Sequence, residues 1–134
     1  DLAILSIGHP GNFVQEAIQE LKEERVSVAH YDMRFVKPID QVMLHEVFTK
    51  FKKVITIEDG CLMGGFGSAV VEFMSDQKYN SEIVRLGIPD EYIHHGTQEE
   101  LWEDCGFDKK AILKTIKKML SISLVEKKSS KEAV

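Results

Sequence analysis

Residues 54–68 have the sequence VITIEDGCLMGGFGS. Its first part, Val54–Ile57, is short and apolar, which indicates a buried strand. A glycine-rich loop follows, and Ser68–Ser75 then carries apolar residues at helical spacing. A buried strand that leads through a loop into a helix is typical of parallel sheets with crossover helices.

The same alternation of strand and helix extends in both directions from this stretch. Further strands are predicted at Leu2–Ile7, Val26–Tyr31 and Ile83–Leu86. Further helices are predicted to begin at Pro10, after the N-cap Asp40 and after the N-cap Asp108. Another helix is predicted to begin at about Thr97, with a capping box of Thr97 and Glu100, and to end at Gly106.

These elements predict one three-layer α/β/α domain over residues 1–120 with a mostly parallel sheet, and residues 121–134, which lose the periodicity, are expected to form a flexible tail. We predict the strand order 2-1-3-4. Because this order reverses between the first and third strands, a crevice is expected there, flanked by Gly8–Gly11 and Glu58–Gly67.

Composition and charge exclude several classes of function. The chain has 134 residues, of which 43% are hydrophobic and 29% charged, as expected of a globular domain. A net charge of -5 argues against a general nucleic-acid binder, and no apolar run approaches the roughly 18–20 residues that a membrane span needs. Cys61 and Cys105 fit no paired metal motif, so we expect reduced thiols in a cytoplasmic protein.

The loop after the strand at 54–57 is the candidate site. Glu58 and Asp59 lie where α/β sites gather, but neighbouring residues of a strand point to opposite faces, which makes them a poor acid–base pair. We predict that one carboxylate binds the amides at the next helix N-terminus. Gly64, Gly65 and Gly67 either cradle an anion or allow a tight turn and close packing, and we favour a structural or interface loop because neither GxGxxG nor a P-loop is present.

No catalytic, cofactor-binding or metal-ligating residue is predicted. The neighbouring His94 and His95 lack a third ligand, and His9 has no nucleophile at a suitable spacing. Residues 88–108 contain seven acidic residues and neither lysine nor arginine, which indicates solvated helix faces or a surface for a basic partner. The seven are Asp90, Glu91, Glu99, Glu100, Glu103, Asp104 and Asp108.

Three segments, taken together in their order and spacing, resemble a known family. They are residues 32–40 (DMRFVKPID), residues 56–70 (TIEDGCLMGGFGSAV) and residues 87–96 (GIPDEYIHHG). They resemble the C-terminal domain of the 1-deoxy-D-xylulose-5-phosphate synthases, within the transketolase C-terminal domain superfamily. Arg34, Pro38 and Asp40 match the superfamily pattern R-x-x-x-P-x-D, and residues 88–96 favour the synthases, although His94 stands where an acid is more usual.

The resemblance implies an enzyme that uses thiamine diphosphate and Mg to condense pyruvate with glyceraldehyde 3-phosphate, with loss of CO2, for isoprenoid, thiamine and pyridoxal synthesis. It implies a cytoplasmic homodimer whose cofactor and substrates lie between the two preceding domains. This chain would then be a noncatalytic scaffold that binds no cofactor. Its partners would be other domains of the same chain and the second subunit, not nucleic acid or membrane.

The chain starts at Asp1 without an initiator Met, so we expect a fragment of a longer enzyme, inactive alone and lacking an upstream edge strand. Two alternatives stay open. The first is the C-terminal domain of another thiamine-diphosphate enzyme, a 2-oxo-acid dehydrogenase beta subunit or a transketolase. The second is a stand-alone flavodoxin-like module that binds an anion. A GDG…N motif far upstream in the same chain would favour the synthase over the dehydrogenase beta subunit and the stand-alone module.

Overall fold

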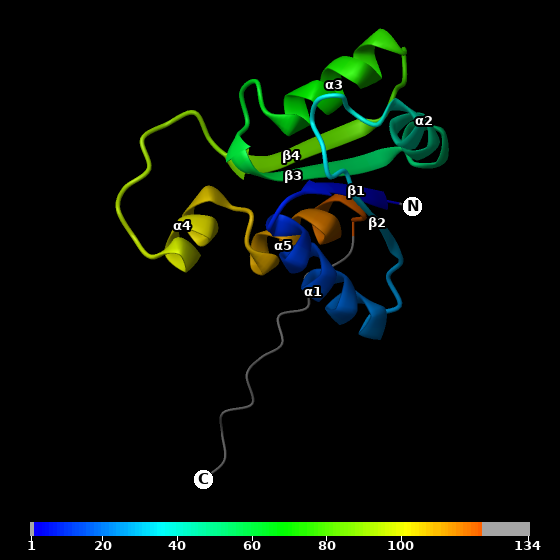
Figure 1. Ribbon diagram of the computed structural model, residues 1–134. Helices are drawn as coiled ribbons and strands as arrows, with labels where there is room; N and C mark the ends of the chain where they lie inside the picture. Colours follow the sequence, from blue (N-terminus) through cyan, green and yellow to red (C-terminus); the bar gives the residue numbers. More distant parts are fainter. Residues whose placement is uncertain (1, 122–134) are drawn as a thin grey trace.

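The computed structural model describes residues 2–121, which form a sheet with helices on both faces (Figure 1). The strands are β1 (Leu2–Ile7), β2 (Val28–Asp32), β3 (Lys53–Cys61) and β4 (Glu82–Ile88). The helices are α1 (Pro10–Glu23), α2 (Gln41–Lys50), α3 (Phe66–Asp76), α4 (Gln98–Cys105) and α5 (Lys109–Met119). The predicted tail falls almost wholly on residues 122–134, which lie outside the described residues.

The strand order is β2-β1-β3-β4 and every pair of neighbouring strands is parallel, which confirms the predicted topology. The central strand β1 pairs on one side with β2, where Leu2 meets Val28, and on the other with β3, where Leu2 meets Lys53. Since all strands run the same way, their carboxyl ends gather at one edge of the sheet.

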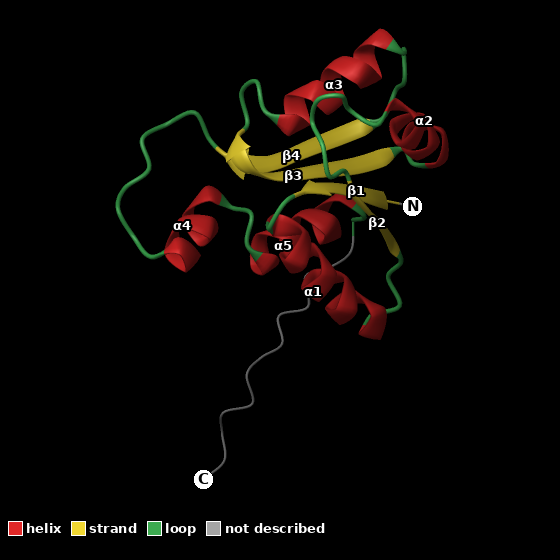
Figure 2. Cartoon of the chain, viewed as in Figure 1, coloured by secondary structure: helices red, strands yellow, loops and turns green. Residues whose placement is uncertain are grey.

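Two apolar cores lie on opposite faces of the sheet, because successive side chains of a strand point to opposite sides. Leu2 and Ile4 of β1 pack in the core beneath α1 and α5. Ala3 and Leu5, the residues between and beyond them, pack in the core beneath α2 and α3. Figure 2 shows this layering, with α2 and α3 on one side of the strands and α1 and α5 on the other.

The helix ends follow the local sequence. Asp40 and Asp108 each accept a hydrogen bond from the amide three residues on, at 2.9 Å, so both predicted N-caps are confirmed. The capping box of Thr97 and Glu100 is present, and Gly106 ends α4 with a φ of 75°.

Several element boundaries differ from the sequence-based prediction. The strand β4 runs from Glu82 to Ile88 where Ile83–Leu86 was predicted, and α3 begins at Phe66 where Ser68 was predicted. The strand β3 continues to Cys61, past the predicted end at Ile57, because the chain rejoins β4 after an irregularity and Cys61 pairs with Ile88. The strand β2 begins at Val28 rather than Val26.

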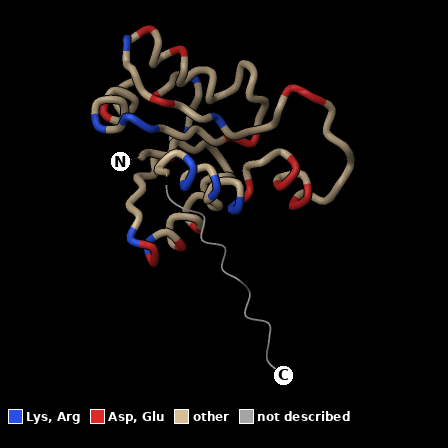
Figure 3. The backbone as a smooth tube through the Cα atoms, turned by 180° about the vertical axis from the view of Figure 1, so that it is seen from behind, with Lys and Arg blue, Asp and Glu red and all other residues tan. Residues whose placement is uncertain are grey.

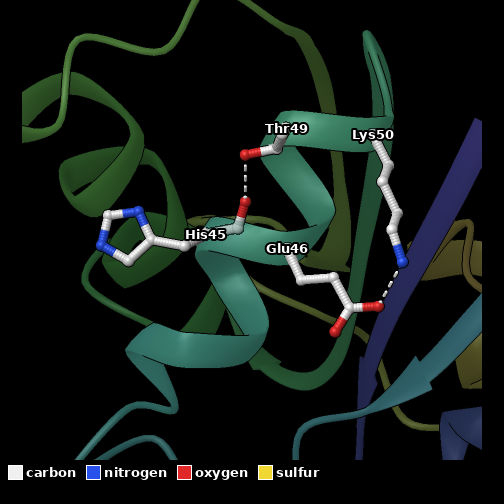
Figure 4. Close-up of polar contacts among 4 residues, drawn as sticks. All are labelled: His45, Glu46, Thr49 and Lys50. Carbon is white, nitrogen blue, oxygen red and sulfur yellow. Dashed lines mark hydrogen bonds and ion pairs between the residues drawn. The ribbon is translucent and has the colours of Figure 1, made fainter.

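Polar residues on α2 make contacts within the helix (Figure 4). The Thr49 hydroxyl donates to the His45 carbonyl at 2.7 Å, and Lys50 pairs with Glu46 at 2.7 Å. Both contacts are exposed and span one helical turn, and the Glu46–Lys50 ion pair supports the helix locally. Among the described helices, none has the length and apolar character needed to cross a membrane.

Candidate functional site

Glu58 lies near the end of β3 and its side chain is buried, with 6% exposed. Its Oε2 accepts the Phe66 amide at 2.8 Å and its Oε1 accepts the Gly67 amide at 2.9 Å. These are the first amides of α3, which have no partner within the helix and carry its positive partial charge. Since the N-cap residue Gly65 has no side chain, the Glu58 carboxylate takes over the capping function.

Asp59, the next residue, is exposed on the opposite side of the strand. It lines a hollow of about 260 Å³ between the ends of β3 and β4 and the helix α4, together with Ile88 and Trp102. The two neighbouring carboxylates therefore have different surroundings. One is bound to the backbone of α3 and the other faces the surface near α4.

The three glycines of the loop differ in what a side chain would meet. Gly64 has a φ of +74°, a conformation that residues with a Cβ rarely adopt, and open space around it. A Cβ on Gly65 would collide with the Cys61 carbonyl oxygen and the Glu58 carboxylate. A Cβ on Gly67 would lie 2.7 Å from Thr56 Oγ1. At Gly65 and Gly67, close approach of the helix to the strand is what requires glycine.

A polar network that no sequence pattern indicated closes the loop. Ser68 Oγ donates to the Leu62 carbonyl at 2.8 Å and accepts the Gly64 amide at 3.1 Å. Arg85 Nη1, from β4, donates to the same carbonyl at 2.8 Å and to Ser68 Oγ at 2.9 Å. The serine in the first turn of α3 is the only part of this network that the local sequence could have indicated. Arg85 could not be predicted, since only the pairing of β4 with β3 brings it close.

The helix α4 lies beside the carboxyl ends of the strands, on the same side of the sheet as α5 (Figure 1). Its Trp102 stacks on His9, which follows β1, with ring centroids 4.9 Å apart, and meets Phe13 edge-on at 4.9 Å. The hollow at this edge is lined by Asp59 and by residues of α4, and Gly8–Gly11 take no part in lining it. The reversal of strand order is thus present, but the predicted flanks of the crevice were wrong in part, because the hollow lies between α4 and the ends of β3 and β4.

A serine–histidine pair lies at the carboxyl ends of β1 and β2. Ser6 Oγ and His30 Nε2 are 2.7 Å apart. Burial lowers the pKa of His30 below its usual value, and the nearby Asp32 partly opposes this. Ser6 is 1% exposed, so its hydroxyl is closed to any substrate and the pair is structural.

The described residues present no cluster of metal-ligating side chains. No group of three or more His, Cys, Asp or Glu side chains converges within residues 2–121 in a way that could hold a metal ion. His94 and His95 are exposed, and Tyr92 meets His94 edge-on at 5.4 Å. Glu58, the buried carboxylate of the loop, is held by α3.

Comparison with known proteins agrees with this architecture. The family model of the transketolase C-terminal domain matches residues 1–112. The 1-deoxy-D-xylulose-5-phosphate synthase of Cytophaga hutchinsonii is 60% identical over 124 residues, which cover 92% of this chain and 20% of that protein. The synthase of Parabacteroides distasonis is 52% identical over 118 residues, covering 88% and 19% respectively. This chain thus spans about a fifth of the length of these curated relatives.

Solved structures give the same result. A split gene transketolase, described as an inactive beta4 tetramer, matches with a TM-score of 0.81 and 30% identity, covering 91% of this chain and 40% of that chain. The transketolase of Campylobacter jejuni matches in fold alone, with a TM-score of 0.55 and 16% identity, over 90% of this chain and 16% of that chain. The chain therefore belongs to the family of transketolase C-terminal domains.

Proposed function

We propose that this chain is the C-terminal domain of a 1-deoxy-D-xylulose-5-phosphate synthase. The full enzyme would be a cytoplasmic transferase that uses thiamine diphosphate and Mg to condense pyruvate with glyceraldehyde 3-phosphate, with loss of CO2. The support is the synthase name carried by relatives 60% and 52% identical over about nine-tenths of this chain. In that enzyme the domain would serve as a noncatalytic scaffold.

One observation carries the scaffold role. The buried carboxylate at the candidate site, Glu58, is bound by two amides of α3, so it is not placed to exchange protons with a substrate. The same loop exposes Met63, 67% accessible, and the loop after β4 exposes Tyr92, 78% accessible. Because the chain spans about a fifth of the length of its relatives, these apolar side chains are available for contact with the rest of such a protein. We infer that the surface around Met63 and Tyr92 contacts another domain of the enzyme or the second subunit of a homodimer.

The split gene transketolase, a relative that shares this fold, is an inactive tetramer of beta chains. That relative supports two parts of the proposal. One is that a chain containing such a domain can assemble with copies of itself, and the other is that such a chain is inactive alone. We accordingly expect the isolated chain to form no deoxyxylulose phosphate and to bind no thiamine diphosphate. Calorimetric titration with the cofactor and Mg measures this, and micromolar binding would contradict it.

Substitutions in the full-length enzyme test the scaffold role directly. Replacing Glu58 or Asp59 by alanine should weaken the dimer or lower thermal stability more than it slows the chemical step, measured by single-turnover kinetics. Glu72→Ala, on the surface of α3, is the matched control and should change neither. A fully stable dimer whose single-turnover rate falls about a thousandfold would place a carboxylate of this domain in the active site and refute the proposal.

The alternative functions differ in their upstream sequence. A 2-oxo-acid dehydrogenase beta subunit would have the GDG…N motif on a separate chain, and a stand-alone anion-binding module would have none. The anion-binding alternative also needs free amides at the start of α3, and the Glu58 carboxylate already occupies the Phe66 and Gly67 amides. That occupation favours the synthase domain over the binding module.

A further inference from the structure

A second hollow of the described residues is a groove of about 580 Å³ between α1, α4 and the start of α5. Phe13 and Trp102 supply aromatic walls. Five carboxylates and only two lysines also line the groove. The carboxylates are those of Glu16, Glu99, Glu100, Glu103 and Asp108, and the lysines are Lys109 and Lys110.

Several of these charged groups already have a role within the fold. Glu100 belongs to the capping box of α4, Asp108 caps α5, and Lys109 pairs with Glu20 at 2.9 Å and interacts with Glu16. Glu99 and Glu103 take part in no side-chain hydrogen bond or ion pair within residues 2–121. They are four residues apart on one helix, so they lie on the same face and repel each other.

The helix that carries these two glutamates is capped at both ends but packs only partly against the rest of the domain. No residue of α4 is fully buried, and its last turn has no basic residue to match the helix dipole. Like charges at this spacing and acids near a helix C-terminus both lower helix stability. Glu99 lies in the first turn, where the helix dipole favours an acid, so the unfavourable charge is that of Glu103 in the last turn together with its repulsion of Glu99. A partner that brings positive charge to this face would remove the repulsion.

The aromatic rings beside the glutamates specify the chemistry further. Lysine and arginine side chains lay their aliphatic stems on apolar surface and place their charge near aromatic faces. The stack of His9 on Trp102, with Phe13 edge-on, offers such a surface at the groove. The groove is therefore suited to several cationic side chains on a chain and not to a single ion, and no metal-binding group occurs among the described residues.

We propose that this groove is a docking site for a basic polypeptide segment of a protein partner, with lysine or arginine side chains at Glu99 and Glu103 and an apolar side chain against Trp102. Charge complementarity argues for this occupant. Figure 3 shows the acidic residues gathered on α4 and on the loop that precedes it. This surface involves neither Glu58 nor the loop of glycines, so it does not rest on the proposed scaffold role.

The test uses the fluorescence of Trp102, the only tryptophan of the chain. The probe is a short lysine- and leucine-containing peptide with blocked ends, titrated into the 134-residue chain. Circular dichroism and thermal melting must first show the folded state. We expect a saturable change in emission, weakened when salt rises from about 20 to 200 mM. The same peptide with glutamine for each lysine should give no saturable change.

Substitutions decide whether the groove is the site. The double variant Glu99→Gln/Glu103→Gln should bind the lysine peptide about fivefold more weakly, because two exposed ion pairs are lost. The control Glu72→Gln/Glu82→Gln makes the same change of charge on α3 and β4 and should bind as the parent does. The absence of saturable binding, or equal weakening in both double variants, would overturn the proposal. Sedimentation that shows a concentration-dependent dimer abolished by Glu99→Gln/Glu103→Gln would also overturn it, since the occupant would then be a second copy of this chain.

Discussion

Replacing Gly65 by alanine places a methyl group in space that two oxygens of the protein already hold. A Cβ at this position falls inside contact distance of the Cys61 carbonyl oxygen and the Glu58 carboxylate, and it lies 2.9 Å from the carboxylate carbon of Glu58. The start of α3 cannot move away freely, because the Phe66 and Gly67 amides are bound to that same carboxylate. Relief of the collision must therefore stretch or break these hydrogen bonds.

The expected loss of stability combines two effects. Overpacking of a close contact costs about 1–3 kcal/mol. Weakening hydrogen bonds to a charged, buried carboxylate costs roughly a further 1.5–3 kcal/mol. We expect the free energy of unfolding to fall by about 3–5 kcal/mol in total, which corresponds to a drop in Tm of roughly 10–20 °C.

Gly64→Ala is the matched control, one residue away in the same loop. Gly64 has a φ of +74° and no atom within 4 Å of the place that a Cβ would take, so only backbone strain is expected, about 1–2 kcal/mol. Urea unfolding followed by circular dichroism measures both variants. If Gly65→Ala proves no less stable than Gly64→Ala, the close-packing argument fails. Adding Glu58→Ala to each variant should couple strongly with Gly65→Ala and weakly with Gly64→Ala.

Three further predictions concern single polar groups. Thr56→Val should raise the free energy of unfolding by up to about 1 kcal/mol, because Thr56 Oγ1 is buried and has no hydrogen-bond partner among the described residues. A lower free energy of unfolding in urea denaturation would contradict this. The free energy of unfolding should fall as pH drops below about 6.5 toward the lowered pKa of His30, because burial disfavours the charged imidazole in the folded state only. His30→Gln should flatten this part of a curve of stability against pH, and an unchanged slope would refute the assignment. Asp108→Ala should cost about 1 kcal/mol by removing the cap of α5, whereas Asp104→Ala, on exposed α4, should cost nothing measurable in the same thermal melt.

Most of the fold could be predicted from local chemistry. The limits of β1 agree with the prediction, and the starts of α1, α2, α4 and α5 follow from Pro10, Asp40, Thr97 and Asp108. Capping residues and apolar periodicity act over a few neighbours, so the sequence alone contains their effect. The strand order was predictable as well, because alternating strands and helices leave few ways to form a parallel sheet.

The candidate site depended on contacts between distant parts of the chain. The pattern at Glu58 and Asp59 indicated that the two carboxylates point apart, but only the packing of α3 against β3 decides that Glu58 is the one bound by the Phe66 and Gly67 amides. Arg85 reaches the loop only because β4 pairs with β3. These contacts require the sheet to be assembled first.

Local patterns along the chain establish the order of the elements, the family resemblance and the positions where glycine and capping residues are needed. The contact of Trp102 of α4 with His9 and Phe13, at the edge where the strand order reverses, appears only in the assembled fold. It could not be predicted because α4 has no fully buried residue and no strong apolar periodicity to fix its place. Its position is set by a few aromatic contacts with α1, a part of the chain about ninety residues earlier, and no local pattern encodes a contact over that separation.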